Sequence, residues 1–102
     1  MLKVKVKKTK DFFSKIDLLG HADYDDFGKD IVCAAASSIL ITTVNAILSF
    51  DKTYITYENK KDHFMIKVNK NNEIVDNLLK NMMNMFDNLK EDYPENIKIE
   101  EE

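Results

Sequence analysis

His21 and Cys33 are the residues of this chain that could do covalent chemistry together. A cysteine thiolate is a strong nucleophile, and a neighbouring histidine can stabilise it by forming an ion pair. His21 follows Gly20 at the end of an apolar segment, and Cys33 follows Asp30 at the start of an alanine-rich one. If a helix begins at Asp30, Cys33 lies about three residues inside it, where unpaired N–H groups lower a thiol pKa below about 8.5. The pair therefore predicts an activated thiol.

Such a pair would cleave a peptide bond by nucleophilic catalysis. The Cys33 thiolate would attack the carbonyl carbon, and the histidine would protonate the departing amine. N–H groups at the helix start, that of Cys33 included, could stabilise the oxyanion. Ser37 lies one turn after Cys33 and could donate a supporting hydrogen bond. Asp30 could either orient His21 or cap the helix, and the sequence leaves both roles open.

Two other interpretations of these residues are weaker in chemistry. A metal site made of His21, Cys33 and His63 matches no compact ligand spacing and lacks a fourth ligand, so we expect neither a metal nor another cofactor. His63 is expected to be an ordinary surface residue at the start of a strand. On pattern alone, a lone cysteine in an alanine-rich helix is more often a buried and inert side chain.

The hydrophobic pattern predicts the elements that would position this pair. Strands are expected at 2–7, 12–19, 53–58, 63–68 and 97–100, and helices at 30–50 and 72–92. Residues 21–29 have no periodicity and are expected to form a loop. The order ββαββαβ predicts an α+β fold with one domain, 1–102, in which one mixed or antiparallel sheet packs against two helices.

The two predicted helices differ in pattern. The apolar residues of 30–50 cover most of the circumference, which predicts a core helix buried on more than one side rather than a membrane span. Its most solvated line should be Ser38, Thr42, Asn45 and Ser49. The helix at 72–92 is amphipathic. Its apolar stripe is expected to be Ile74, Leu78, Met82, Met85 and Leu89, flanked by Val75, Leu79 and Phe86.

Composition sets the class and the compartment. An apolar content of 44% and a charged content of 32% are typical of a soluble globular protein. The net charge of −3 and the absence of arginine argue against direct nucleic-acid binding. A single cysteine cannot form a disulfide within the chain, which suits a reducing cytoplasm. The N-terminal segment alternates lysine with apolar residues and so does not resemble a signal peptide. We therefore expect a cytoplasmic location and no membrane contact.

The segment GHADYDDFGKDIVCAAAS, residues 20–37, resembles the signature of the ribosomal-processing cysteine protease family, Prp. That signature joins a Gly-His-Ala step, a short loop with a glycine, and an Asp-Ile-Val-Cys-Ala-Ala-x-Ser step. The matching positions here are Gly20, His21, Gly28, Asp30, Cys33 and Ser37. The lysine/valine first strand, both helices and the Tyr-Pro step before the last strand also agree with the family.

The resemblance implies a specific function. Family members remove a short N-terminal extension from bacterial large-subunit ribosomal protein twenty-seven, cutting just after a hydrophobic, aromatic-containing stretch. They form homodimers, and the loop between His and Cys is thought to move when substrate enters. Here that loop is 22–29, with Gly20 and Gly28 as natural hinges. The alternative is a non-catalytic module that binds a ribosomal protein or an assembly intermediate.

The same loop is also the expected substrate contact. Its residues are Ala22, Asp23, Tyr24, Asp25, Asp26 and Phe27, followed by Gly28 and Lys29. The three aspartates depart from the family, which often has a small residue after the alanine, and this leaves the fine substrate preference open. Tyr24 and Phe27 could serve as lid residues that contact a hydrophobic peptide, or they could simply hold the loop against the core.

Overall fold

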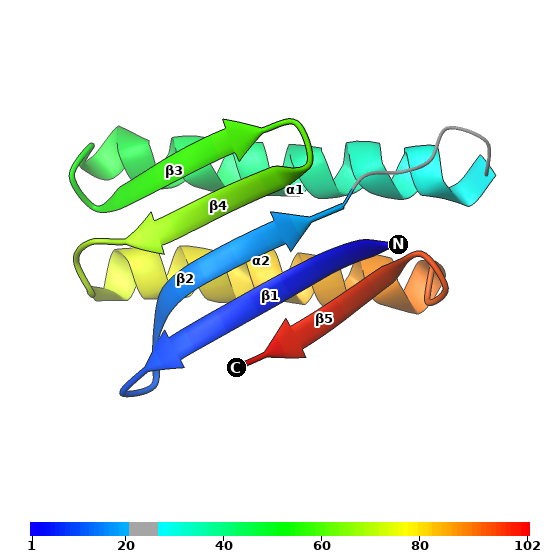
Figure 1. Ribbon diagram of the computed structural model, residues 1–102. Coiled ribbons are helices and arrows are strands. Elements are labelled where there is room, and N and C mark those ends of the chain that lie inside the picture. The colour runs from blue at the N-terminus through cyan, green and yellow to red at the C-terminus, as the bar shows by residue number, and fades with distance from the viewer. Residues whose placement is uncertain (21–26) are drawn as a thin grey trace.

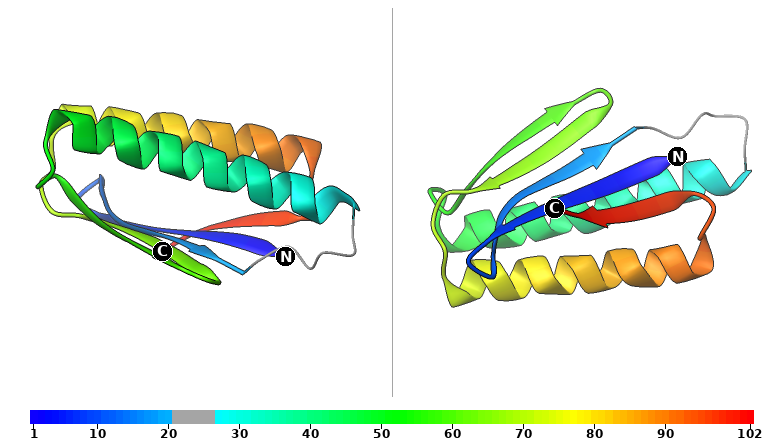
Figure 2. Two further views of the ribbon diagram at one scale, coloured as in Figure 1. Left: turned by 90° about the horizontal axis from the view of Figure 1, so that it is seen from above. Right: turned by 60° about the horizontal axis from the view of Figure 1, so that its bottom comes forward.

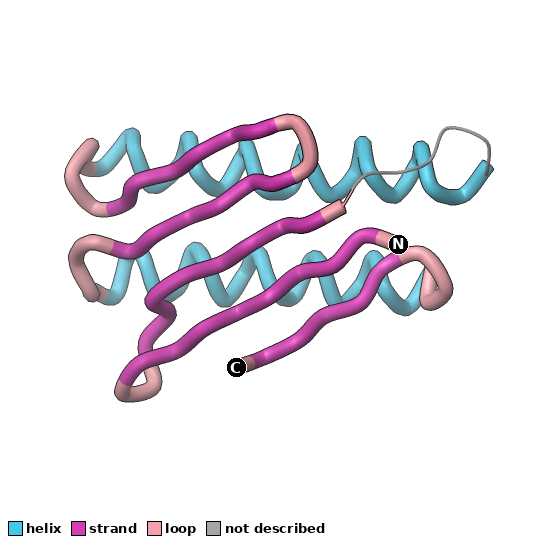
Figure 3. The backbone as a smooth tube through the Cα atoms, viewed as in Figure 1, coloured by secondary structure: helices cyan, strands magenta, loops and turns pink. Residues whose placement is uncertain are grey.

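A computed structural model describes residues 1–20 and 27–102, and for residues 27–30 it describes the backbone alone. The elements are β1 (Leu2–Thr9), β2 (Phe12–Leu19), α1 (Phe27–Phe50), β3 (Ile55–Lys60), β4 (His63–Val68), α2 (Glu73–Asp92) and β5 (Ile97–Glu101). The five strands form one sheet in the order β3-β4-β2-β1-β5, and both helices lie on the same face of it (Figures 1 and 2). Among the described strands only β1 and β5 pair in parallel, so of the two arrangements expected, mixed or antiparallel, the sheet is mixed. The predicted order ββαββαβ is confirmed, and Figure 3 shows these strands and helices along the backbone.

The β1–β2 hairpin forms as its alternating pattern predicts. Leu2, Val4 and Val6 are buried on the helix side, which leaves the lysines between them on the other side. Strand β1 extends to Thr9, so the turn is shorter than expected. Its two residues are Lys10 and Asp11, whose φ angles are 54° and 67°. Two successive positive φ angles suit a tight hairpin, because their twist matches that of the flanking strands.

Strand β3 starts two residues later than the pattern predicts. One Asp51 side-chain oxygen accepts hydrogen bonds from the Thr53 backbone N–H at 2.8 Å and from its hydroxyl at 2.7 Å. These bonds hold Thr53 in a turn and keep it out of the sheet. The strand instead continues to Lys60, which pairs with His63 across the turn to β4. The connection between the expected strands, residues 59–62, is therefore confined to a turn at Lys61 and Asp62.

Helix α2 begins where the side chain of Asn72 accepts a hydrogen bond from the Val75 N–H at 2.9 Å. Its fully buried residues are Val75, Leu79, Met82 and Phe86. The expected stripe was therefore wrong at two positions, because Ile74 and Met85 are exposed. Two overlapping apolar lines run along this helix, and only packing against α1 and the sheet selects between them.

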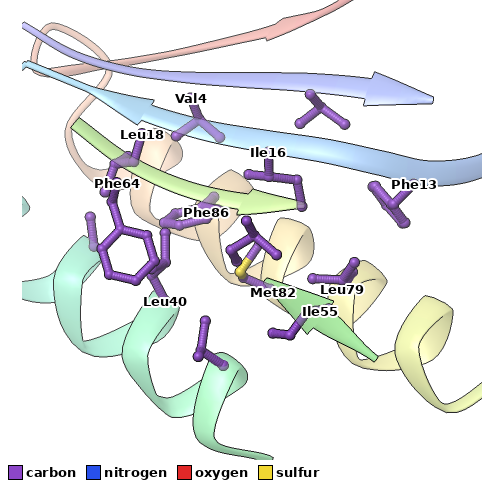
Figure 4. Packing of buried hydrophobic residues seen from close by; sticks show 14 of the residues in the cluster. Val4, Phe13, Ile16, Leu18, Leu40, Ile55, Phe64, Leu79, Met82 and Phe86 are labelled. Carbon is purple, nitrogen blue, oxygen red and sulfur yellow. The ribbon is translucent and has the colours of Figure 1, made fainter. Parts of the chain in front are cut away.

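Helix α1 carries one buried line rather than several. That line is Val32, Ala36, Leu40, Val44 and Ile47, and Figure 4 shows Leu40 in the core with Phe64 and Phe86. The expected solvated line, residues 38, 42, 45 and 49, is exposed and is confirmed. The prediction of burial on more than one side is wrong, because Ile31, Ile41 and Phe50 are 40%, 45% and 61% exposed. A two-layer domain leaves the outer side of each helix without a covering layer.

The apolar character of α1 extends beyond its buried line. Residues 31–50 have a mean hydropathy of 2.1, long and apolar enough to cross a membrane by length and composition, and a third of this stretch is buried. The buried line packs into the same core as α2 and the sheet, and Thr43 on that side donates its hydroxyl to the Ile39 carbonyl at 2.8 Å. The helix is therefore an element of the folded domain whose outer side presents Ile31, Ile41 and Phe50 beside the solvated polar line.

Candidate active site

A cleft of about 100 Å³ opens beside Cys33, between α1 and the sheet. Its lining comes from four places in the chain: one side of α1, the start of β1, the end of β2, and the turn from β3 into β4. The lining residues are Leu2, Leu18, Gly20, Cys33, Ser37, Leu40, Ile41, Asn59, Lys60, Lys61, Asp62, His63 and Phe64. The cleft thus combines a thiol and a hydroxyl with an apolar wall and a charged rim.

Cys33 and Ser37 lie on the same side of α1, as their spacing predicts. Both side chains are half-buried and both line the cleft. Cys33 is a free thiol, and its burial is intermediate rather than complete. The hypothesis that Cys33 is an inert packing residue is therefore not favoured, because the buried line of the helix runs through Val32 and Ala36 and leaves Cys33 at its margin.

The expected start of this helix was wrong. Helix α1 begins at Phe27, three residues before Asp30, so Asp30 is not the N-cap residue and Gly28 and Lys29 belong to the helix rather than to a loop. A single glycine costs a helix only about 1 kcal/mol, so Gly28 does not delay the helix start. Because only the first four N–H groups of a helix lack partners, the N–H of Cys33 is committed within the helix and is not free to bind an oxyanion. The helix start also lies too far from Cys33 to stabilise a thiolate, since the dipole effect falls off within the first turn.

The end of strand β2, which directly precedes the expected catalytic histidine in the sequence, borders the same cleft. Gly20, which directly precedes His21, lines the cleft, and its N–H donates a hydrogen bond to the Asp62 carbonyl at 3.0 Å. Its φ of +88° favours glycine, and a Cβ atom here would stand 2.8 Å from the Met1 carbonyl oxygen. His21 itself lies outside the described residues, as do the loop residues 22–26 and the side chains of Phe27 and Asp30.

The turn between β3 and β4 was missed as part of the site. The sequence indicates only a polar connection between the expected strands 53–58 and 63–68, yet its four residues all line the cleft: Asn59, Lys60, Lys61 and Asp62. They reach it because β4 pairs with β2, which places this turn beside Gly20. No signal within the turn itself indicates this position. Only the order of the strands in the sheet does.

His63 does not join Cys33 in a metal site. Its neighbour Phe64 is buried on the helix side, so alternation directs the His63 ring to the opposite face of the sheet. There its Nε2 lies 2.6 Å from a carboxylate oxygen of Asp17. His63 is also half-buried, so it is more than the ordinary surface residue that the sequence predicted. Among residues 1–20 and 27–102 no group of three potential ligands could hold a metal ion.

Known proteins resemble this chain over most of its length. The family model of cysteine protease Prp matches residues 1–98. Over 83 residues the chain is 40% identical to the ribosomal processing cysteine protease Prp of Staphylococcus aureus strain Mu50, with 78% of each protein covered. Crystal structures of the Staphylococcus aureus protease Prp have TM-scores of 0.88 with a covalently linked product peptide, at 30% identity, and 0.91 with a substrate peptide, at 28% identity. Both comparisons cover each chain completely. This chain belongs to the cysteine protease Prp family.

Proposed function

We propose that this cysteine protease removes the N-terminal extension of bacterial large-subunit ribosomal protein twenty-seven, with Cys33 as nucleophile and His21 as general acid and base. The observation that carries the proposal is that Cys33 and Gly20, the residue before His21, line the same cleft. The relatives in Staphylococcus aureus are ribosomal processing proteases, and one of them holds a covalently linked product peptide. These facts favour catalysis over the non-catalytic binding module.

The cleft supports a hydrophobic substrate segment. Leu18, Leu40 and Phe64 supply an apolar wall, and Ile41 adds a partly exposed side chain at its edge. Burying an aromatic side chain of a peptide on such a wall would give most of the binding energy, as apolar contacts do in ligand clefts. This matches an extension that is cut just after a hydrophobic, aromatic-containing stretch. The substrate contacts of residues 22–29 remain part of the proposal.

The reaction proceeds in two balanced steps. The Cys33 thiolate forms a bond to the peptide carbonyl carbon, and the C–N bond breaks as protonated His21 gives its proton to the departing amine. Water, deprotonated by His21, then attacks the thioester and releases a carboxylate and the thiol. Because Cys33 lies beyond the first turn of α1, the thiolate depends on His21 rather than on the helix start.

A carboxylate beside His21 would orient its ring. The sequence offered Asp30 for this role, and the structure adds Asp62, whose backbone holds Gly20 and whose residue lines the cleft. The variants Asp30→Asn and Asp62→Asn separate the two. The orienting residue should lower kcat with little change in KM and shift the pH profile of kcat/KM, while the other variant should leave both unchanged. Equal and small effects in both variants would remove the orienting carboxylate from the proposal.

Substrate cleavage tests the central proposal directly. The protein would be incubated with the organism's own extended ribosomal protein twenty-seven, and the product mass measured. We expect loss of the N-terminal extension with the wild-type chain, no cleavage with Cys33→Ala, and about a 10²–10⁴-fold slower rate with His21→Ala. Ser38→Ala, on the exposed side of the same helix, is the matched control. Cleavage by Cys33→Ala would contradict the proposal.

Thiol labelling isolates the ion pair from the rest of catalysis. Iodoacetamide near neutral pH should modify Cys33 quickly in the wild-type protein, because the thiolate is the reacting form. His21→Ala should slow this modification, since the imidazolium that favours the thiolate is gone. Unchanged labelling of His21→Ala would show that the two side chains do not form an ion pair.

The exposed side of α1 supports the proposed homodimer. Ile31 and Ile41 are exposed there beside small residues, Ala34 and Ser38, which allow two helices to approach closely. A chain of 102 residues also gains stability from burying such a surface in an interface. Ile31→Lys should convert a dimer to a monomer in sedimentation velocity. Ile74→Lys on α2 is its matched control, because Ile74 is 38% exposed and Ile31 is 40% exposed.

We also propose the reducing cytoplasm as the working compartment. The free Cys33 thiol needs that environment to stay reduced and nucleophilic. The apolar outer side of α1 would then be covered by a second copy rather than by lipid. Fractionation of cells that express the chain would test this, and recovery in the membrane fraction would contradict it.

A further inference from the structure

The face of the sheet opposite the helices is uncovered in the part of the chain that the structure describes (Figure 2). Because strand side chains alternate, the residues between the buried ones of β1 lie on this open face: Lys3, Lys5 and Lys7. A hollow of about 340 Å³ lies on it as well. Three lysines, Lys5, Lys7 and Lys15, line it together with Asp17 and Glu102. This open face lies on the other side of the sheet from Cys33. Lys60 and His63 at its edge also line the catalytic cleft, but Lys5, Lys7 and Lys15 do not, so the cleft does not account for them.

Strand register arranges the open face into three rows. The first row is Lys7, Lys15 and Lys67, which stand directly opposite one another on β1, β2 and β4. The second row is Lys98, Lys3, Leu19, His63 and Lys60. The third row is Glu100, Lys5, Asp17, Met65 and Glu58, and it lies between the other two. Two basic rows therefore flank a mainly acidic one.

The first row is electrostatically unfavourable in the free protein. Like charges directly opposite one another destabilise a sheet, and three lysines occupy adjacent strands here. Lys15 has one partner, Asp17, at 3.8 Å, while Lys7 and Lys67 form no ion pair with any described residue. The positive charge of this face also acts on Glu100. A hydrogen bond from Lys98 and the charges of Lys3, Lys98 and Lys5 lower the pKa of its carboxyl.

We propose that this open face binds the phosphate backbone of double-stranded RNA. The two basic rows are four residues apart along β1, which is about 13 Å at roughly 3.3 Å per residue, so each row can meet one phosphate strand. In the acidic row, Glu100 pairs with Lys98 at 3.1 Å and Glu58 pairs with Lys60 at 3.6 Å, each through one carboxylate oxygen. The second oxygen of each remains to accept hydrogen bonds from the 2′-hydroxyl groups that line the shallow minor groove of an A-form helix. DNA has no such donors, and this difference favours RNA.

Other polyanions fit the face less well. The carboxylates of Asp17, Glu58 and Glu100 would repel an acidic peptide that lay across the rows. The rows contain no Phe, Tyr or Trp side chain to enter a lipid surface or to stack on unpaired bases. The net charge and the absence of arginine predicted no nucleic-acid partner, but they describe the whole chain. The fold gathers lysines on one face, and lysine is suited to phosphate contacts that do not read sequence.

The test is binding of a fluorescein-labelled RNA duplex of mixed sequence, followed by anisotropy from 50 to 200 mM salt. The wild-type chain should bind with a Kd of about 1–100 µM and a steep salt dependence, as non-specific backbone contacts do. The triple variant Lys7→Gln, Lys15→Gln, Lys67→Gln should bind at least about tenfold more weakly, with a salt slope lower by about 3. A DNA duplex of the same length should bind more weakly than the RNA.

The matched control carries the same charge change elsewhere. Lys52→Gln, Lys70→Gln and Lys90→Gln alter exposed lysines outside the open face, and this variant should keep wild-type affinity. Cleavage of a short unstructured peptide verifies that each variant is folded and should be equal in all three proteins. Equal weakening by both triple variants would overturn the proposal. Polyglutamate or phosphatidylserine vesicles binding as tightly as RNA would overturn it too, and would assign the face to an acidic protein or a membrane.

Discussion

The two helices of this protein follow different rules although they lie side by side on one face of the sheet. Helix α2 begins with a capping residue, Asn72, and carries Glu73 and Asp76 in its first turn and Lys90 in its last. These charges complement the helix dipole. Helix α1 has no basic residue in its last turn and has a glycine, Gly28, near its start. Local sequence rules thus account for α2 better than for α1.

Their outer surfaces differ in the same direction. Helix α2 exposes Ile74 and Met85 among mostly polar positions, whereas α1 exposes Ile31, Ile41 and Phe50 and also borders the cleft with Cys33. A helix whose task is to complete a core needs one apolar side, and α2 has that form. A helix that also supplies a nucleophile and a surface for a second copy departs from this form. Departures from local rules therefore mark the functional helix here.

The largest expected difference between the helices is in the effect of removing a phenylalanine ring. Phe86 on α2 is fully buried, so Phe86→Ala should lower the free energy of unfolding by about 3–5 kcal/mol. Phe50 at the end of α1 is 61% exposed, so Phe50→Ala should change it by less than about 0.5 kcal/mol. Urea unfolding followed by circular dichroism measures both. Similar losses would mean that the end of α1 is buried in solution.

A smaller effect is expected where the chain leaves β2 for α1. Gly20→Ala should cost about 1–3 kcal/mol, because the positive φ is strained for alanine and its Cβ would press on the Met1 carbonyl oxygen. Since Gly20 precedes His21, peptide cleavage should fall more than the stability loss explains under conditions where the variant stays folded. Wild-type cleavage and stability would show that this backbone conformation is not required.

The order of the strands and helices could be predicted from the sequence because the strands and α2 follow local hydrophobic periodicity. Strands β2 and β4 agree with their predicted bounds at 12–19 and 63–68. The sequence placed the start of α1 wrongly, since a loop-like composition with Gly28 concealed three helical residues. It also missed the turn at 59–62 as a wall of the cleft, because that position follows from the pairing of β4 with β2. Non-local contacts of this kind leave no local signal.

The cap of α2 should be worth less than the buried ring. Asn72→Ala removes the acceptor for the Val75 N–H and should lower the free energy of unfolding by about 1 kcal/mol. Asn77→Ala, at an exposed position inside the same helix, should instead raise it by a few tenths of a kcal/mol, because alanine is the better helix former. Opposite signs from the same substitution would confirm that α2 is stabilised by local rules. Equal signs would not.

The smallest effect concerns the turn that follows α1, where the Asp51 carboxylate accepts two hydrogen bonds from Thr53. Hydrogen bonds from the Thr53 hydroxyl and N–H, and the charge of Lys70, lower the pKa of Asp51. A carboxyl whose folded pKa lies below its unfolded value, about 3.9, stabilises the fold above that pH and loses this contribution as pH falls through the folded pKa. Asp51→Asn keeps an acceptor for Thr53 but removes the charge. The variant should therefore melt below the wild-type protein at pH 6, and the two melting temperatures should converge toward pH 2. A difference that stays constant across this range would mean that the turn depends on the hydrogen bonds alone.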